Sequence, residues 1–456
     1  MFVPSTRQLW FVGLVITPLA FALGVAGLSL TMILLVCGCL LGLTMVDALI
    51  SLNRFLAVEV TLPPLIRISK GKRFDLTAEV KDNAHVCRAI TLGLALPRSL
   101  EVSSFTVTKA LHHADPKPES LTWEVLALER GNSVLDTIYL QTPSVLGFWE
   151  MRAARPVRCE IRVYPDLSRE KNVLAPLFFR RGSLGSHQVR QVGKGREFQQ
   201  LRAYLPGDSY DDIYWKGTAK RRFPVTMMYQ IERTQELHVI LDVSRRSARP
   251  LEASRRGQAG ESDRFAPKDQ CERFIQSALI LALAAQQQAD RFGLMVFSDQ
   301  VHTVLPAGSG PAHYNACRDT LYQVQPRVVS PDYQELFVQI GNRLRHRSLV
   351  IILTDLAEPW LSESFSEAVK QAARRHVILV HSLGSREFQP LFQKDSDIRH
   401  VDDLYGKLAG HLLWSDLQGT SKQLKQSGVH LTSSVQESLV ADVVTSYLNV
   451  KKRQLL

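Results

Sequence analysis

Residues 237–243 read "LHVILDV", an apolar run that ends next to a carboxylate. Three more runs of this kind follow: "RFGLMVF" at 291–297, "LVIILTDL" at 349–356 and "HVILVHSL" at 376–383. Near-continuous apolar strands are typical of parallel sheets that are buried on both faces. Helical patterns lie around them, at about 271–289, 312–325, 333–344 and 362–375. The alternation predicts a doubly wound, mostly parallel α/β domain over residues 236–456.

Two acids follow strands of this predicted sheet, Asp242 in the first and Asp355 in a later one. Ligands of such sheets gather where loops leave the carboxyl ends of the strands. Asp242 and Ser244 can present oxygen atoms of the kind that Mg²⁺ and Mn²⁺ prefer, but the next slot holds Arg246, which opposes a cation unless it points away. Two interpretations stay open. Asp242, Ser244 and Asp355 form a degraded Mg²⁺ or Mn²⁺ site, or Asp242 and Ser244 only hydrogen-bond to neighbouring loop amides.

Catalytic templates are missing from the sequence. It has no Cys-x-x-Cys or His-Glu-x-x-His spacing, no phosphate-binding loop and no Gly-x-Ser-x-Gly nucleophile turn. His238, His376 and His381 lie in or at the ends of apolar runs, where packed histidines are more common than catalytic ones. We therefore expect a protein that is not an enzyme and needs no cofactor. The remaining enzymatic alternative is a hydrolase that uses Asp242 or Asp355 as a general base.

Residues 201–222 read "LRAYLPGDSYDDIYWKGTAKRR" and lie in the most basic part of a chain whose net charge is +11. The Pro-Gly-Asp sequence at 206–208 predicts a turn, and the acids after it suit the start of a short helix near Ser209. The segment is either a polar clamp that fixes 169–235 to the sheet domain or a docking surface for a partner. Its three aspartates argue against nucleic acid, because they repel phosphates.

Residues 56–168 change to a period of two. Phe74, Leu76, Ala78 and Val80 alternate with polar residues, and short runs such as "LTWEVLAL" and "CEIRVYP" continue the pattern. Turn residues separate these runs. The pattern predicts a small antiparallel β-sandwich.

The N-terminus carries no charge between Arg7 and Asp47. As one helix this stretch would be roughly 59 Å long, whereas a bilayer core is about 30 Å thick. We therefore expect a two-helix transmembrane hairpin over residues 1–52, which binds the lipid bilayer. A cleaved signal peptide is the competing interpretation. Basic residues at both ends of the hairpin predict a multi-pass inner-membrane protein with both termini in the cytoplasm, and the six scattered cysteines agree with a reducing compartment.

The segment "GREFQQLRAYLPGDSYDDIYWKGTAKRR", followed by "LHVILDVS", resembles the signature of the domain-of-unknown-function family fifty-eight (DUF58). The sheet domain of that family is similar to the von Willebrand factor A fold. The matching positions are Gly195, Glu197, Phe198, Leu201, Arg202, Tyr204, Pro206, Gly207, Asp208, Ile213, Trp215, Lys216, Thr218 and Ala219. Two positions depart from the pattern, since the family usually has Arg at Asp211 and Asp at Tyr214.

The resemblance implies a role for several of these residues. Glu197, Arg202, Tyr204, Gly207, Asp208, Trp215 and Lys216 would form a structural or partner-binding signature. The A-type fold often carries a metal-ion-dependent adhesion site that Asp242, Ser244 and Asp355 match. Arg246 does not match it, and the slot for a Thr near "VVSPDYQ" holds none, although Ser330 is close. Metal-free binding is therefore implied.

The resemblance also implies a partner. Members of the family are typically encoded beside MoxR-type AAA+ ATPases. The expected function is a membrane-anchored, cytoplasm-facing protein-binding adaptor that works with such an ATPase in the assembly or maturation of a protein complex. A metal-dependent ligand-binding domain is the alternative.

Overall fold

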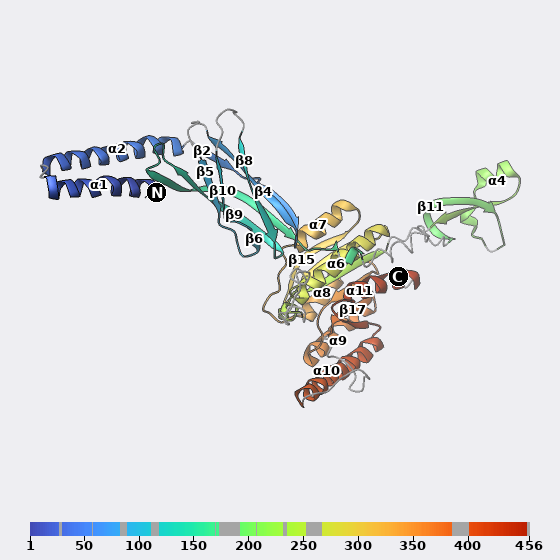
Figure 1. Ribbon diagram of the computed structural model, residues 1–456. Coiled ribbons are helices and arrows are strands. Elements are labelled where there is room, and N and C mark those ends of the chain that lie inside the picture. The colour runs from blue at the N-terminus through green and yellow to red at the C-terminus, as the bar shows by residue number, and fades with distance from the viewer. Residues whose placement is uncertain are drawn as a thin grey trace. The chain divides into compact units, whose positions relative to one another are not determined.

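The computed structural model describes the chain apart from residues 27–29, 57, 83–88, 111–117, 169, 173–191, 207, 231–234, 252–266, 385–400 and 454–456. The chain forms two compact units, Met1–Asp166 and Leu167–Leu456. Figure 1 shows the helices and strands of both units. Each unit is described below by itself.

The predicted membrane hairpin over residues 1–52 is wrong. The segment does form two helices, α1 (Thr6–Ala26) and α2 (Leu30–Leu56). However, no helix in the described part of the chain is long and apolar enough to cross a membrane. The predicted multi-pass inner-membrane location, with both termini in the cytoplasm, is corrected by the same finding. The prediction rested on the absence of charge, which does not reveal how apolar a helix is or which residues it uses for packing.

Helix α2 is fixed to the first unit by buried polar contacts near its C-terminal end. Asp47 is buried and accepts hydrogen bonds from Ser144 Oγ at 2.6 Å and from the Leu146 amide at 3.0 Å. The indole Nε1 of Trp149 donates to the carbonyl of Thr44 at 2.9 Å. A buried carboxylate is tolerated only with such donors. This end of α2 therefore packs against the part of the first unit that contains Ser144, Leu146 and Trp149.

Two sheets make up most of the first unit. One has the order β1-β10-β9-β5-β7 with β3 on β10, and the other has the order β2-β4-β8-β6. All pairings are antiparallel except β3–β10, which is parallel. The strands are β1 (Phe2–Pro4), β2 (Val58–Thr61), β3 (Leu65–Ser69), β4 (Arg73–Asp82), β5 (Ala89–Leu94), β6 (Leu100–Val102), β7 (Thr106–Ala110), β8 (Glu119–Ala127), β9 (Gly131–Pro143) and β10 (Trp149–Tyr164).

Both sheets contribute to one apolar core. Leu76 and Trp123 come from one sheet, Leu92 and Ile161 come from the other, and all four belong to the same buried cluster. In β4 the burial alternates as the period of two predicts, with Leu76 and neighbouring apolar residues inside and polar residues outside. Burial of each such large side chain stabilises the fold by about 1.5–3 kcal/mol.

The signature segment in the second unit forms a small structure of its own. Strands β11 (Val192–Ala203) and β12 (Val225–Gln230) pair antiparallel. Between them lie the 3-10 helix η1 (Tyr210–Asp212) and helix α4 (Trp215–Arg221). The short helix predicted near Ser209 is thus present, as a single 3-10 turn that begins at Tyr210.

The rest of the second unit is built on a six-stranded sheet with the order β15-β14-β13-β16-β17-β18. All strands are parallel to their neighbours except β15, which is antiparallel to β14. The strands are β13 (Glu236–Asp242), β14 (Arg291–Phe297), β15 (Val301–Gly308), β16 (Leu349–Leu353), β17 (Val377–Leu383) and β18 (His430–Ser434). The helices are η2 (Arg245–Ala248), α6 (Gln270–Gln287), α7 (Pro311–Leu321), α8 (Tyr333–Arg343), α9 (Pro359–Ala373), α10 (Val401–Gln426) and α11 (Leu439–Arg453).

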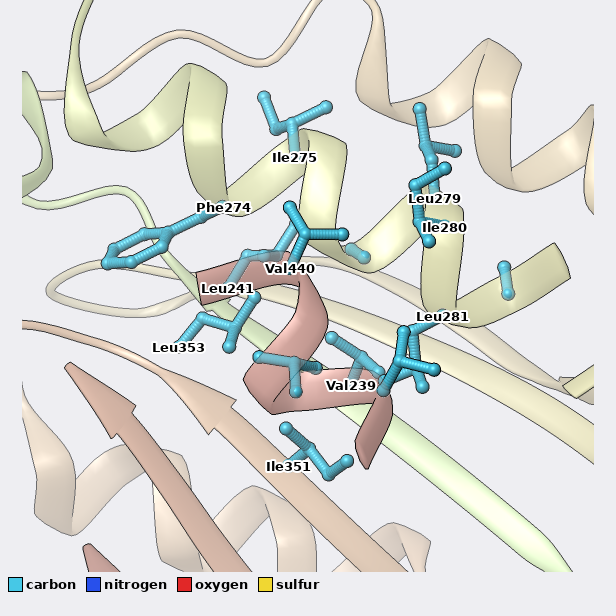
Figure 2. Packing of buried hydrophobic residues seen from close by; sticks show 14 of the residues in the cluster. Val239, Leu241, Phe274, Ile275, Leu279, Ile280, Leu281, Ile351, Leu353 and Val440 are labelled. Atoms are coloured by element: carbon cyan, nitrogen blue, oxygen red, sulfur yellow. The ribbon is translucent and has the colours of Figure 1, made fainter. Parts of the chain in front are cut away.

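The central strands bury both faces, as the apolar runs predicted. Val239 and Leu241 of β13 pack in one cluster with residues of α6 and α11, and Figure 2 shows them below Phe274 and Val440. Ile240, which lies between them in the chain, packs in a second cluster with residues of α8 and α9. Side chains alternate across a strand, so each central strand supplies both cores.

Candidate functional site

The site lies where the chain changes direction across the sheet. From β13 the chain builds β14 and β15 on one side, and later builds β16, β17 and β18 on the other. β13 and β16 are neighbours, so the loops after Asp242 and Leu353 leave the same edge in different directions. Polar groups can meet at such a switch point.

The Asp242 carboxylate is held by hydrogen bonds at this edge. Oδ2 accepts from Thr354 Oγ1 at 2.6 Å, and Oδ1 accepts from the Ser244 amide at 2.8 Å. The Thr354 hydroxyl also hydrogen-bonds to the Tyr333 hydroxyl, at 2.9 Å. All four residues are buried, which makes each of these bonds costly to lose.

Burial shapes the titration of these groups. It raises the pKa of Asp242, while hydrogen bonds from Thr354 and Ser244 oppose the rise. Burial also raises the pKa of Tyr333 well above its usual value, and the charge of Asp242 adds to this effect. The Tyr333 hydroxyl therefore stays protonated at physiological pH.

Arg246, on the η2 turn, points into the site. Its Nη2 lies 2.8 Å from Asp355 Oδ2, and its Nη1 lies 2.7 Å from Glu358 Oε1. The Arg246 side chain is only 12% exposed and that of Asp355 is 1% exposed, so this is a mostly buried ion pair. Asp355 Oδ1 accepts from the Ala357 amide at 3.0 Å. Both oxygens of the Asp355 carboxylate therefore have partners.

The fold brings the three predicted metal-site residues, Asp242, Ser244 and Asp355, to one edge. Sequence reasoning missed Thr354, which donates to Asp242, and Glu358, which shares the Arg246 guanidinium with Asp355. It looked for the missing hydroxyl near Ser330, whereas Thr354, directly before Asp355, donates to Asp242. The "TD" pair at the end of a predicted strand was the signal that could have revealed it.

The donors present do not fit a bound divalent cation. Among the described residues no three His, Cys, Asp or Glu side chains lie together as a metal site. Asp355 already neutralises a guanidinium, and Asp242 accepts from Thr354 and from an amide. The arrangement holds a positive charge that belongs to the chain itself.

The signature segment contains a second polar cluster, centred on Asp208. This carboxylate pairs with Arg202 and accepts from the Leu205 amide at 3.1 Å and from Thr226 Oγ1 at 3.3 Å. It therefore connects β11, the turn and β12. The described ion pair of Asp208 is with Arg202 on β11.

Other signature residues are differently placed. Trp215 and Tyr210 are 68% and 74% exposed, and Lys216 is also exposed. Tyr204 stacks on Tyr210 with ring centroids 6.2 Å apart. Gly207 and the side chain of Glu197 lie outside the described residues.

The two departures from the family pattern also have defined places. Tyr214 precedes α4, and its amide donates to the Val225 carbonyl at 2.8 Å. Asp211 lies in η1 and is exposed. Tyr214 therefore takes part in joining α4 to β12, whereas Asp211 faces solvent.

The second unit thus contains a doubly wound α/β domain whose polar site lies at the switch point of the sheet. Residues 200–389, which span much of the signature segment and the central strands, match the family model described as "Protein of unknown function DUF58". A search of curated proteins finds no match.

Several solved structures resemble parts of the chain. The conserved hypothetical protein BatB from Bacteroides thetaiotaomicron is 17% identical, with a TM-score of 0.30 over 48% of this chain and 99% of BatB. An aerotolerance-related membrane protein from Bacteroides fragilis NCTC 9343 is 16% identical, with a TM-score of 0.27 over 46% of this chain and 96% of that protein. Proximal thread matrix protein 1 from the mussel byssus is 14% identical, with a TM-score of 0.24 over 47% of this chain and 45% of that protein.

Proposed function

We propose that the chain is a protein-binding adaptor without catalytic activity, which works with a MoxR-type AAA+ ATPase in the assembly or maturation of a protein complex. The strand order and the site at the switch point support a von Willebrand factor A-like interpretation of the sheet domain. The partnership with the ATPase rests on the resemblance to the DUF58 family.

One observation carries the binding role. Next to the polar site, exposed side chains form a rim that consists of Arg245, Val328 and Trp360. Val328 is 91% exposed and Trp360 is 49% exposed. Arg245 and Trp360 both contact Glu358, at 3.5 and 2.9 Å, and the Arg245 amide donates to the Val329 carbonyl, which places the loop at 328 beside η2. Exposed tryptophan and arginine side chains are frequent in the energetic centres of protein interfaces.

The buried site itself supports the absence of catalysis. The Asp355 carboxylate is neutralised by Arg246, and the Asp242 carboxylate is buried and hydrogen-bonded to Thr354. A general base must reach a substrate proton, and neither carboxylate is exposed. These observations weigh against the hydrolase alternative, and the lack of a fitting donor set weighs against metal-dependent binding.

The test is capture of the ATPase by the full chain. We expect an affinity-tagged chain, expressed in its native cell, to co-purify with a MoxR-type AAA+ ATPase. Trp360→Ala should weaken the binding about thirtyfold and lower the recovery accordingly, since hot-spot residues contribute about 2 kcal/mol or more. The control is Val338→Ala, which truncates an exposed apolar residue in the middle of α8. Equal recovery with Trp360→Ala and wild type would exclude the rim as the binding surface, and repeated failure to recover any ATPase would end the adaptor proposal.

The signature segment is a second candidate surface, because Trp215 is the most exposed tryptophan of the second unit among its described residues. Trp215→Ala in the same capture experiment separates the two surfaces. Loss of the ATPase with Trp215→Ala and not with Trp360→Ala would move the binding site to the segment between β11 and β12.

A further inference from the structure

The positive charge of Arg246 connects the two loops that follow β13 and β16. The guanidinium of Arg246 bridges two carboxylates, with 2.8 Å to Asp355 and 2.7 Å to Glu358. Arg246 and Asp355 are 109 residues apart in the sequence and come from the loops after two adjacent strands. Hydrogen bonds between a charged guanidinium and a carboxylate are among the stronger hydrogen bonds in proteins. Arg246 therefore joins the η2 turn to the loop between β16 and α9.

Carboxylate and hydroxyl oxygen atoms lie around this ion pair. Asp242 and Asp355 are buried at the ends of neighbouring strands. Ser244 Oγ is fully buried and has no hydrogen bond of normal geometry among the described residues, although it lies close enough to the Asp242 carboxylate to oppose the rise of its pKa. A buried hydroxyl whose hydrogen bond is poor costs free energy and requires an explanation. Its oxygen atom, with lone pairs to spare, is of the kind that can act as a ligand for a divalent cation.

We infer that the Arg246 guanidinium takes the place and the charge of a divalent cation at this edge, so that the site works without metal and becomes a metal site when Arg246 is removed. A guanidinium stays charged at all physiological pH values, so it supplies a permanent positive charge to Asp355. A divalent cation at Asp355 would lie within a few ångströms of that charge, and like charges at this distance repel strongly in a buried site.

This inference goes beyond the proposed function and does not depend on it. It concerns how the carboxylates are neutralised, whichever partner the rim binds. It predicts that chelators leave the protein unchanged. It also predicts that Asp242, Ser244 and Asp355 have retained the geometry of an oxygen-ligand site, which a single substitution can reveal.

The experiment measures Mn²⁺ binding to the full chain by electron paramagnetic resonance, together with the shift in Tm on addition of Mg²⁺. The test variant is Arg246→Ser, which replaces the guanidinium with a hydroxyl and leaves the carboxylates in place. The matched control is Arg245→Ser, because Arg245 lies on the same turn and contacts Glu358 but has no contact with Asp355 among the described ion pairs. Arg249 lies 3.7 Å from Asp355 Oδ2, so the double variant Arg246→Ser/Arg249→Ser is measured as well.

We expect wild type and Arg245→Ser to bind no Mn²⁺ at millimolar concentration. Arg246→Ser or the double variant should bind one Mn²⁺ with a Kd at least about tenfold below the highest concentration at which wild type shows no binding, a gain of at least about 1.4 kcal/mol. Adding Asp355→Asn to the binding variant should abolish the gain, because it removes a charged oxygen ligand.

Two results would overturn the inference. One is a wild-type protein that binds Mn²⁺ and loses it with Asp355→Asn. The other is folded arginine variants that bind no more Mn²⁺ than wild type. Near-ultraviolet circular dichroism checks that the variants are folded. If Arg246→Ser does not fold, Arg246→Gln takes its place, since it keeps a longer polar side chain without the charge, and the same two results decide.

Discussion

At the scale of single residues, consecutive side chains at the end of β16 serve different partners. Thr354 donates its hydroxyl to Asp242, whereas Asp355, the next residue, pairs with Arg246. Neighbouring residues of extended chain point in opposite directions, so two adjacent positions can complete two different contacts. The edge is therefore held by one hydrogen bond from a hydroxyl and by one ion pair.

The first prediction tests the hydrogen bond from Thr354 to Asp242. Thr354→Val removes the hydroxyl that bonds to Asp242 and Tyr333 and leaves two buried polar groups with fewer partners. We expect a loss of about 1–3 kcal/mol in the free energy of unfolding of the second unit. Urea denaturation followed by circular dichroism measures it. Thr354→Ser keeps the hydroxyl, so it should lower the free energy of unfolding clearly less than Thr354→Val does. Equal losses would mean that the effect comes from packing and not from the hydrogen bonds.

A buried histidine makes stability depend on pH. His381 in β17 is fully buried, and burial lowers its pKa to about 4, although the nearby Asp442 opposes the shift. Both of its ring nitrogens lack a hydrogen-bond partner among the described residues. The folded protein therefore keeps this ring neutral at pH values where the unfolded chain, with an ordinary pKa of about 6.5, binds a proton.

The second prediction follows from that difference in proton binding. Above pH 6.5 the ring is neutral in both states and contributes no pH dependence. Between about pH 6.5 and pH 4 the unfolded state binds more protons, so the free energy of unfolding should fall as the pH falls, by on the order of 3 kcal/mol at the lower end. Urea denaturation at pH 7.5, 6 and 4.5 measures the slope. His381→Leu should reduce the slope, and an unchanged slope would mean that His381 does not titrate in this way.

At the scale of elements, α4 depends on a close contact between Gly217 and Tyr214. A Cβ atom at Gly217 would lie 2.4 Å from Cδ1 of the Tyr214 ring. The ring belongs to the residue before α4, whose amide is bonded to β12. The missing side chain of Gly217 thus allows α4 to pack on the residue that joins it to the strand.

The third prediction concerns Gly217→Ala. The added methyl group forces the Tyr214 ring to move, and we expect the segment from β11 to β12 to be destabilised by about 1–3 kcal/mol. Amide hydrogen exchange over residues 192–230 measures the local effect. The control is Gly341→Ala in α8, where a Cβ meets no atom within 4 Å and the same substitution should stabilise the helix by about 0.5–1 kcal/mol. Similar exchange rates in Gly217→Ala and wild type would show that the ring moves at no cost.

Elements with a strong apolar signal were predicted and weaker ones were not. The four apolar runs all lie in the sheet as β13, β14, β16 and β17. The edge strands β15 and β18 were missed because their residues are half-buried or polar, as in "HLTSS" of β18. An edge strand has only one neighbouring strand and is less buried, so its sequence can contain more polar residues.

At the scale of the whole molecule, two units have separate cores. Leu92 belongs to the cluster between the two sheets of the first unit, and Ile351 belongs to a cluster of the second unit. Both side chains are fully buried. Each core therefore contributes to the stability of its own unit.

The fourth prediction uses one core residue from each unit. Leu92→Ala and Ile351→Ala should each cost about 2–5 kcal/mol, because both leave a cavity in a packed core. We expect Leu92→Ala to lower the Tm of one thermal transition and to leave a second transition unchanged. Ile351→Ala should lower the Tm of the second transition and leave the first unchanged. Differential scanning calorimetry of the full chain resolves the two transitions. A single transition that both substitutions lower equally would mean that the units unfold together.

The sequence by itself determined the four inner strands of the sheet and the positions of the acids that follow them, because the apolar run is a local property that burial on both faces imposes on each inner strand. It did not determine the contacts of α1 and α2, where the absence of charge was taken for a membrane span. It also could not show that Arg246 reaches Asp355 and Glu358, or that Thr354 supplies the hydroxyl for Asp242. Those contacts join residues more than a hundred positions apart. They exist only because β16 pairs beside β13, so the tertiary structure alone decided that the charge at this edge comes from the chain.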